Sequence, residues 1–283
     1  MAVADHDMTR SPQCGVVYVV FGDSYVAEAK TSIQSLRATG STLPIAVITN
    51  RPWEEEPKPD QFVIRADNLL FASRPEYVYE GTPFEQTLLV DADTYFCRKP
   101  DRVFGLLEHY EMGGLFAGPQ LRTEDEGLYF HPKLNGGVIL FRKHPKVKAL
   151  FEIWRDTYRE KLAAESAPRG WIAPDDQRVL TLAVVRSGVR HVHLGDWMNF
   201  VLWRTTTSLS PPVILHGRDS SMAWVSNLLS AGWDEHRDWR QRVWIPHAKG
   251  LLPGGGVGWY DPLLRAWALL RRTVNRLRRR KFR

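Results

Sequence analysis

The chain has 283 residues, 43% hydrophobic and 25% charged, a composition typical of a globular protein with room for one large α/β domain or two small ones. Only two cysteines occur, which excludes a disulfide framework and favours a reducing compartment. Nine of the 38 basic residues lie in 262–283; the remaining 29 face 32 acidic residues, a net charge of −3. We therefore do not expect a nucleic-acid-binding body.

Residues 1–13 are polar and lack the basic start and apolar run of a signal peptide. No apolar run in the chain reaches the ~20 residues that a bilayer-spanning helix needs. We therefore expect a cytoplasmic protein.

Apolar runs alternate with helical patterns along the chain. Val16–Phe21 is an uninterrupted apolar run, typical of a strand covered on both faces, and a helical pattern follows through 27–40. This beginning predicts an α/β fold with a doubly wound, mostly parallel central sheet flanked by helices. Further strands are expected at 44–49, 62–64, 87–90, 115–117, 137–141, 191–194 and 213–215. Further helices are expected near 146–163 and 175–187.

The end of the chain differs from the rest. Residues 251–258 are Gly-rich and typical of a linker. In 262–283, apolar residues recur at spacings of four and three, which predicts a basic amphipathic helix. We predict a catalytic domain at 1–248, and a linker with this tail at 249–283. The tail fits an anionic membrane surface at the inner face of a membrane, with packing on the catalytic domain as an equal alternative and RNA binding third.

Two aspartates follow a predicted buried strand directly. Leu88-Leu89-Val90 forces Asp91-Ala92-Asp93 to the carboxyl end of that strand, the edge at which open α/β sheets bind ligands. Two carboxylates there suit a hard divalent cation, which neutralises the charge that a departing diphosphate acquires. The alternative is a pair of solvated turn aspartates; we favour a metal-diphosphate site.

Several segments together resemble the nucleotide-diphosphosugar transferases of the glycosyltransferase A fold, closest to family eight, the glycogenin-like and galactosyltransferase-like group. The resemblance covers roughly 15–225, and the ordered set is more specific than any one motif. The segments are Gly22-Asp23-Ser24-Tyr25, the D-x-D segment 82–94, Asn135-Gly136-Gly137-Val138-Ile139-Leu140-Phe141, Asp176-Gln177 and Val213-Ile214-Leu215-His216.

The resemblance implies a metal site made of Asp91, Asp93 and His216. Taken alone, His216 fits a structural histidine at a strand end; the resemblance makes it the third ligand, through a neutral imidazole nitrogen. This mixed set of oxygen and nitrogen ligands suits Mn²⁺, with Mg²⁺ as the alternative.

The resemblance also implies a donor site, with a UDP-sugar as the default donor. It places Asp23 and Tyr25 at the base, and the glycines after Asn135 beside the donor sugar. The expected donor-binding residues are Asp23, Tyr25, Arg74, Asn135, Gly136, Gly137 and Arg218. Asp176 and Gln177 are expected to bind donor hydroxyls and flank the anomeric carbon. Simple turns, a surface arginine and a helix cap at Asp175 are the competing interpretations.

The segment after His216 departs from the family pattern. Trp224 keeps the family spacing, but Met222 stands where a phosphate-binding lysine is expected, and Arg218 is the replacement cation. Upstream, Asp196, Trp197, Asn199 and Trp203 form a polar, aromatic stretch, which we interpret as a loop, with acceptor binding as the alternative.

The sequence therefore predicts a metal-dependent glycosyltransferase whose acceptor is a glycan, a lipid-linked molecule or a small molecule, with stereochemistry left open. A non-catalytic, partner-binding relative is the alternative, given weight by Met222. A phosphohydrolase is less favoured because Tyr95 stands where that chemistry wants Thr or Val. A nucleotidyltransferase is disfavoured because Gly22-Asp23-Ser24-Tyr25 is not a Gly-rich loop ending in basic residues.

Overall fold

A computed structural model describes residues 13–65, 74–120, 131–164, 175–204, 206–208, 210–218, 222–230, 242–245 and 250–252. The predicted tail at 262–283 lies outside these residues, so its helix and its membrane contact stay predictions. Among the helices described, none is long and apolar enough to cross a lipid bilayer.

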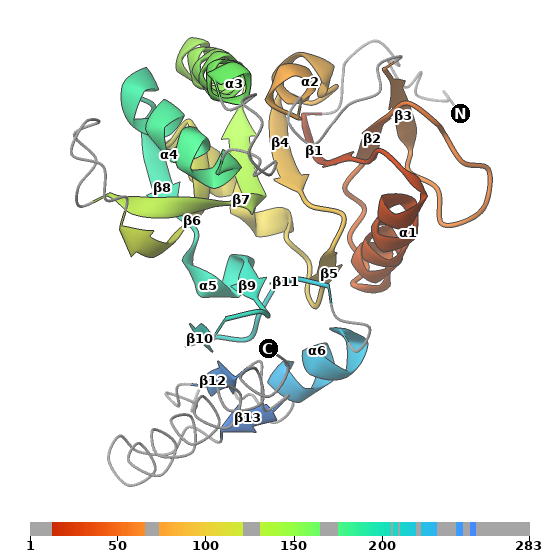
Figure 1. The fold of residues 1–283 in the computed structure, drawn as a ribbon. Coiled ribbons are helices and arrows are strands. Elements are labelled where there is room, and N and C mark those ends of the chain that lie inside the picture. The colour runs from red at the N-terminus through yellow and green to blue at the C-terminus, as the bar shows by residue number, and fades with distance from the viewer. Residues whose placement is uncertain are drawn as a thin grey trace, which may run out of the picture.

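A seven-stranded sheet forms the centre of the molecule, in the order β3-β2-β1-β4-β7-β6-β8 (Figure 1). Its strands are β1 (Cys14–Val19), β2 (Ile45–Thr49), β3 (Gln61–Ile64), β4 (Gln86–Val90), β6 (Met112–Gln120), β7 (Pro132–Arg142) and β8 (His191–His193). Only β7 runs antiparallel to its two neighbours. The predicted α/β fold with a mostly parallel sheet is therefore confirmed.

Helices cover both faces of this sheet. Alternate residues of β1 divide between two cores, with Val16 and Tyr18 in one and Val17 in the other. The first core packs under α1 (Asp23–Ala38) and a 3-10 helix (Asp101–Glu108). The second packs under α2 (Arg74–Gly81), α3 (Pro145–Ala164) and α4 (Asp176–Ser187), which gather on the opposite side from α1 in Figure 1. Burial on both faces explains why the strands read as continuous apolar runs.

Two small sheets lie beyond the carboxyl edge of the central sheet. One has the order β5-β11-β9 and consists of β5 (Thr94–Phe96), β9 (Phe200–Val201) and β11 (Ile214–His216); a short helix, α5 (Gly195–Met198), precedes β9. The other consists of β10 (Thr206–Ser208), β12 (Arg242–Ile245) and β13 (Gly250–Leu252). Residues of β9, β11 and α6 (Met222–Ser230) share a third apolar core with Trp244.

Strand β13 changes one detail of the sequence interpretation. Leu251 and Leu252, expected to begin the linker, pair with Trp244 and Val243 of β12 instead. Two apolar residues that complete a strand ladder gain backbone hydrogen bonds that a solvated linker lacks. The remainder of the expected linker lies outside the described residues.

Candidate metal and donor site

The turn between β4 and β5 carries the two aspartates and is anchored on both sides. The amide of Asp91 donates to the carbonyl of Gly137 on β7 at 2.9 Å, and the Oγ1 of Thr94 donates to the carbonyl of Asp91 at 2.8 Å. Thr94 Oγ1 in turn lies 2.8 Å from the buried Ser32 hydroxyl of α1. Buried polar groups with every partner in place hold a backbone in one position, so this turn is fixed between β7 and α1.

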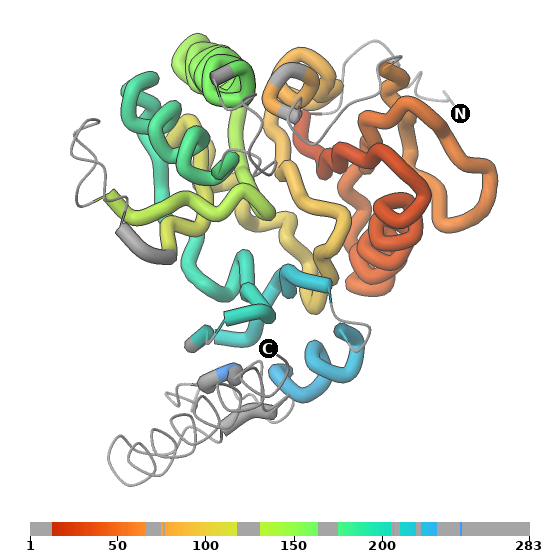
Figure 2. The backbone as a smooth tube through the Cα atoms, in the orientation of Figure 1, coloured from red at the N-terminus to blue at the C-terminus, as the bar shows by residue number. Residues whose placement is uncertain are grey.

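The small sheet brings His216 to this turn from 123 residues further along the chain. Strand β11 pairs antiparallel with β5, so that His216 stands opposite Thr94, and the amide of Gly217 donates to the carbonyl of Asp93 at 2.9 Å. Figure 2 shows the backbone of this late segment running beside the β4–β5 turn. Backbone hydrogen bonds therefore hold the D-x-D turn and the histidine next to each other.

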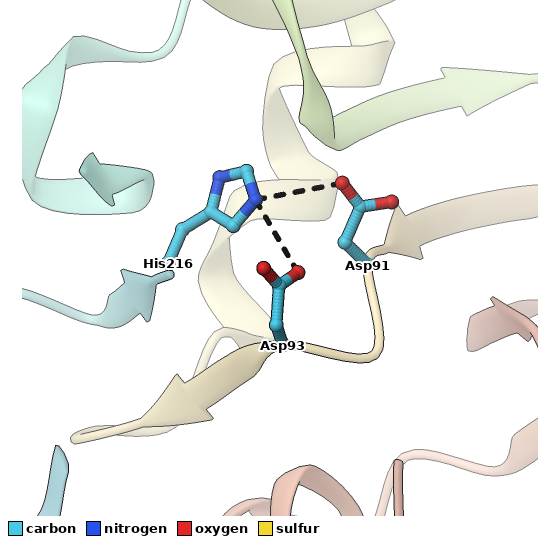
Figure 3. A group of neighbouring side chains, drawn as sticks. All are labelled: Asp91, Asp93 and His216. Atoms are coloured by element: carbon cyan, nitrogen blue, oxygen red, sulfur yellow. Dashed lines mark ion pairs between the residues drawn. The ribbon is translucent and has the colours of Figure 1, made fainter. Parts of the chain in front are cut away.

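The side chains of Asp91, Asp93 and His216 converge (Figure 3). The Nε2 of His216 lies 3.4 Å from Asp91 Oδ2 and 3.5 Å from Asp93 Oδ1. The His216 side chain is 4% exposed, that of Asp93 12% and that of Asp91 24%, so the cluster opens to solvent on the aspartate side. It is the only group of three potential ligands this close together in the part of the chain described.

A chain of hydrogen bonds determines the tautomer of His216. The amide of Gly137 donates to Asn135 Oδ1 at 3.0 Å, and Asn199 Nδ2 donates to the same oxygen at 2.9 Å. Asn199 Oδ1 therefore points to His216 Nδ1, 2.9 Å away, and accepts its proton. In the neutral ring Nε2 is then the unprotonated nitrogen, which is the state a metal ligand requires.

The charge balance of the metal-free cluster favours a proton on Nε2. Burial lowers the pKa of His216, but the hydrogen bonds and charges of Asp91 and Asp93 outweigh it and raise the pKa to about 9. A proton thus sits where two carboxylates and an imidazole converge, and a divalent cation can replace it. Two carboxylates and one imidazole form a donor set that fits Mn²⁺, with Mg²⁺ as the harder alternative.

Two glycines make room for the histidine and its neighbour. A Cβ on Gly137 would lie 1.9 Å from His216 Cε1, so only glycine permits the ring at this place. Gly217 has a φ of +141°, and a Cβ there would collide with the ring of Trp203. This ring packs edge to face against the ring of His216, with centroids 4.7 Å apart.

A cavity of about 480 Å³ adjoins the cluster. It lies between α1, the β4–β5 turn, Gly217 and the start of α6, and both Asp93 and Arg218 line it. Arg218 Nε lies 2.7 Å from Glu28 Oε1, and its guanidinium stands over the Tyr25 ring at 5.5 Å. The structure therefore brings Arg218 and Tyr25, two of the predicted donor-site residues, into contact, and Arg218 lines the cavity together with Asp93.

Other predicted residues take separate places. Asp23 opens α1, is almost fully exposed and lies 3.8 Å from Arg51. Arg74 opens α2, and its side chain is outside what the structure describes. Asn135 is buried in the relay to His216, and a Cβ on Gly136 would meet only Leu180, at 3.7 Å.

The pair Asp176-Gln177 opens α4, as the sequence predicted, and Asp175 caps the helix by accepting from the Arg178 amide. Asp176 Oδ1 accepts from Trp154 Nε1 at 2.8 Å, and the Gln177 carbonyl accepts from Thr181 Oγ1. Their contact with a donor sugar stays a prediction.

Sequence reasoning missed two residues. Asn199, assigned to an ordinary loop, is fully buried and orients His216. Glu28, which forms an ion pair with Arg218, lies in α1, in a stretch where the sequence pattern predicts only a helix. One signal could have pointed to Glu28. Met222 stands where the resemblance places a lysine, so another cation is needed nearby, together with a residue that holds it.

Comparisons with known proteins add fold-level likenesses only. No protein-family model matches this sequence, and no curated protein matches it. Solved structures that it resembles include the apo glycosyltransferase GlyE of Streptococcus pneumoniae TIGR4, with a TM-score of 0.48, 17% identity and coverage of 75% of this chain and 56% of that one. This chain therefore spans little more than half of GlyE.

The match extends over nearly the whole length of two further solved structures. Apo mouse xyloside xylosyltransferase 1 gives a TM-score of 0.47 at 14% identity, with 73% of this chain and 98% of that chain covered. An active-site mutant of LgtC gives 0.47 at 12% identity, with 78% and 98% covered. Glycosyltransferases are thus among the solved structures that this chain resembles in part, and membership of family eight stays a prediction.

Proposed function

We propose that this chain is a glycosyltransferase that moves a sugar from a nucleoside-diphosphate sugar, with a UDP-sugar as donor, to an acceptor hydroxyl. One observation carries the proposal: two carboxylates and an oriented imidazole nitrogen converge at the carboxyl edge of the sheet, beside a cavity that also holds Arg218. Asp91, Asp93 and His216 would hold Mn²⁺ or Mg²⁺.

In this reaction the bond between the anomeric carbon and the donor's phosphate oxygen breaks, and its electron pair leaves with the diphosphate. The acceptor oxygen forms the new bond to the anomeric carbon, and its proton passes to the departing diphosphate if configuration is retained or to a general base if it is inverted. The transition state has oxocarbenium character, as in glycoside hydrolysis. A bound divalent cation supplies the Lewis-acid neutralisation of the leaving diphosphate.

The chain's own residues prepare this site. The relay through Asn135 and Asn199 holds His216 with Nε2 toward the aspartates. Arg218 lines the cavity with Asp93 and adds a second positive charge for the diphosphate, and Glu28 fixes its position. These arrangements exist before the donor arrives, so little binding free energy is lost to reorganisation.

The remaining assignments follow the sequence analysis. Asp23 and Tyr25 receive the base, Arg74 a phosphate, and Gly136 lies near the donor sugar. Asp176 and Gln177 receive the sugar hydroxyls. They open α4, whose middle lies against β7, where the amide of Leu134 donates to Thr181 Oγ1 at 2.9 Å.

The test is turnover of UDP-sugars with Mn²⁺, measured as released UDP. Asp93→Asn should lower the rate at least about 100-fold, because it removes a ligand and a charge at the diphosphate. Asp156→Asn, which removes a half-exposed carboxylate from α3, is the matched control and should leave the rate unchanged. Equal rates in the two variants, or no binding of Mn²⁺ and UDP by calorimetry, would contradict the proposal and favour a partner-binding protein.

A further inference from the structure

Two exposed tryptophans lie on the chain between β8 and β11, and one of them, Trp203, contacts the ring of His216. Trp203 is 53% exposed and Trp197 39% exposed. Their neighbours Arg204 and Asp196 form an ion pair, with Arg204 Nη2 3.0 Å from Asp196 Oδ1, which links the two segments. We call these four residues the indole platform.

Trp203 is held in place. Its ring packs edge to face against the ring of His216, and Gly217 leaves the space it occupies; a Cβ on Gly217 would lie 2.9 Å from Trp203 Cε3. A large apolar ring that stays half-exposed while the backbone is shaped to hold it indicates a surface for a ligand rather than a filler of the core.

The position of the platform separates it from the diphosphate cavity. Asp93, Gly217 and Arg218 line that cavity, whereas Trp203 and Trp197 are not among its lining residues. His216 lies between the two features, with its Nε2 toward the aspartates and its ring against Trp203. A molecule on the platform would therefore lie beside the metal ligands without occupying the nucleotide's place.

We propose that the indole platform binds the acceptor, and that the acceptor is a neutral saccharide. This inference rests on the proposed function. A sugar ring has an apolar face that stacks on an indole and a rim of hydroxyls that hydrogen-bond to a carboxylate and a guanidinium. Asp196 and Arg204 cancel each other's charge, so the platform offers both kinds of contact without favouring an anion or a cation.

The experiment uses the full chain with Mn²⁺ and UDP on an array of neutral oligosaccharides, followed by calorimetry with the tightest one. Wild type should retain at least one saccharide, Trp203→Ala should weaken it about tenfold or more, and Trp203→Phe should keep part of the binding because a smaller ring remains. Trp197→Ala should also weaken it, and this variant leaves the His216 contact untouched.

Binding of Mn²⁺ and UDP distinguishes the possible failures. It should stay unchanged in Trp203→Phe and Trp197→Ala. The inference is overturned if wild type retains no saccharide, if these variants bind saccharide as wild type does, or if they lose UDP equally, which would place the indoles in the donor site. If the wild-type protein bound neither Mn²⁺ nor UDP, the proposed function itself would be refuted.

Discussion

Gly137→Ala is the substitution for which the structure gives the most definite expectation. The new Cβ would lie 1.9 Å from Cε1, 2.3 Å from Nδ1 and 2.6 Å from Nε2 of His216. An ordinary carbon contact needs about 3.5 Å, so the ring must move by more than an ångström. The movement breaks the bond from Nδ1 to Asn199 and turns Nε2 away from Asp91 and Asp93.

Two terms set the size of the effect. Overpacking a tight interior costs about 1–3 kcal/mol, and leaving the buried amide oxygen of Asn199 without its donor costs about 1–3 kcal/mol more. The free energy of unfolding should therefore fall by about 2–6 kcal/mol in the metal-free protein, and Tm should fall by roughly 4–12 °C, at about 2 °C per kcal/mol for a chain of this size. Affinity for Mn²⁺ should fall at least about 10–100-fold, as when a ligand loses its orienting partner.

Gly136→Ala is the matched control, one residue away on the same strand. Its Cβ would meet only Leu180 Cδ2, at 3.7 Å, an ordinary contact, so stability and Mn²⁺ affinity should change little. Thermal unfolding without metal and calorimetry with Mn²⁺ measure both quantities. If the two alanine variants bound Mn²⁺ equally, His216 would not be held against β7 and the proposed metal site would lose its third ligand.

Four further outcomes are expected. Asn199→Ala should lower Mn²⁺ affinity about 10–100-fold by calorimetry, because His216 Nδ1 loses its acceptor. Since the pKa of His216 is raised to about 9, Mn²⁺ must displace a proton at neutral pH, and its apparent affinity should rise up to about tenfold per pH unit from pH 7 to 9 and then level off. For the same reason, the stabilisation from protonated His216 in the metal-free protein is complete below about pH 6.5 and is lost as pH rises through 9, which pH-dependent unfolding measures. Arg218→Ala should weaken UDP binding about tenfold in calorimetry and uridine binding by less, since the cation lines the diphosphate cavity.

The sequence predicts the central sheet well where strands are buried on both faces, and less well where they are not. Val16–Phe21 and the run before Asp91 follow the pattern of covered strands, and both lie in the core. Strand β7 begins at Pro132, five residues before the expected start. The sequence pattern does not predict this because, among residues 132–136, Leu134 is the only large apolar residue and the proline, asparagine and glycine are typical of a turn. Their place in the sheet depends on tertiary contacts, such as the Leu134 amide donating to Thr181 of α4.

The candidate site is predictable as a set of residues but not as a geometry. The end of β4 fixes Asp91 and Asp93 because a buried strand must deliver them to the sheet edge. His216 reaches them only through the pairing of β5 with β11, two strands of three residues each, which no periodicity reveals. The resemblance predicted that His216 belongs with the two aspartates, and the structure shows that the pairing of β5 with β11 brings them together.

Gly137 links Asp91 to His216, and this explains why a local pattern around either residue alone is insufficient. Its carbonyl accepts from the amide of Asp91, and its own amide begins the relay through Asn135 and Asn199 that leaves His216 Nε2 unprotonated in the neutral ring. The hydrogen atom in place of its Cβ gives the imidazole ring its space. The sequence interpretation assigned this glycine to the close approach of a donor sugar. That contact stays a prediction, and the geometry gives a further reason for glycine at this position, because a Cβ there would lie 1.9 Å from Cε1 of His216.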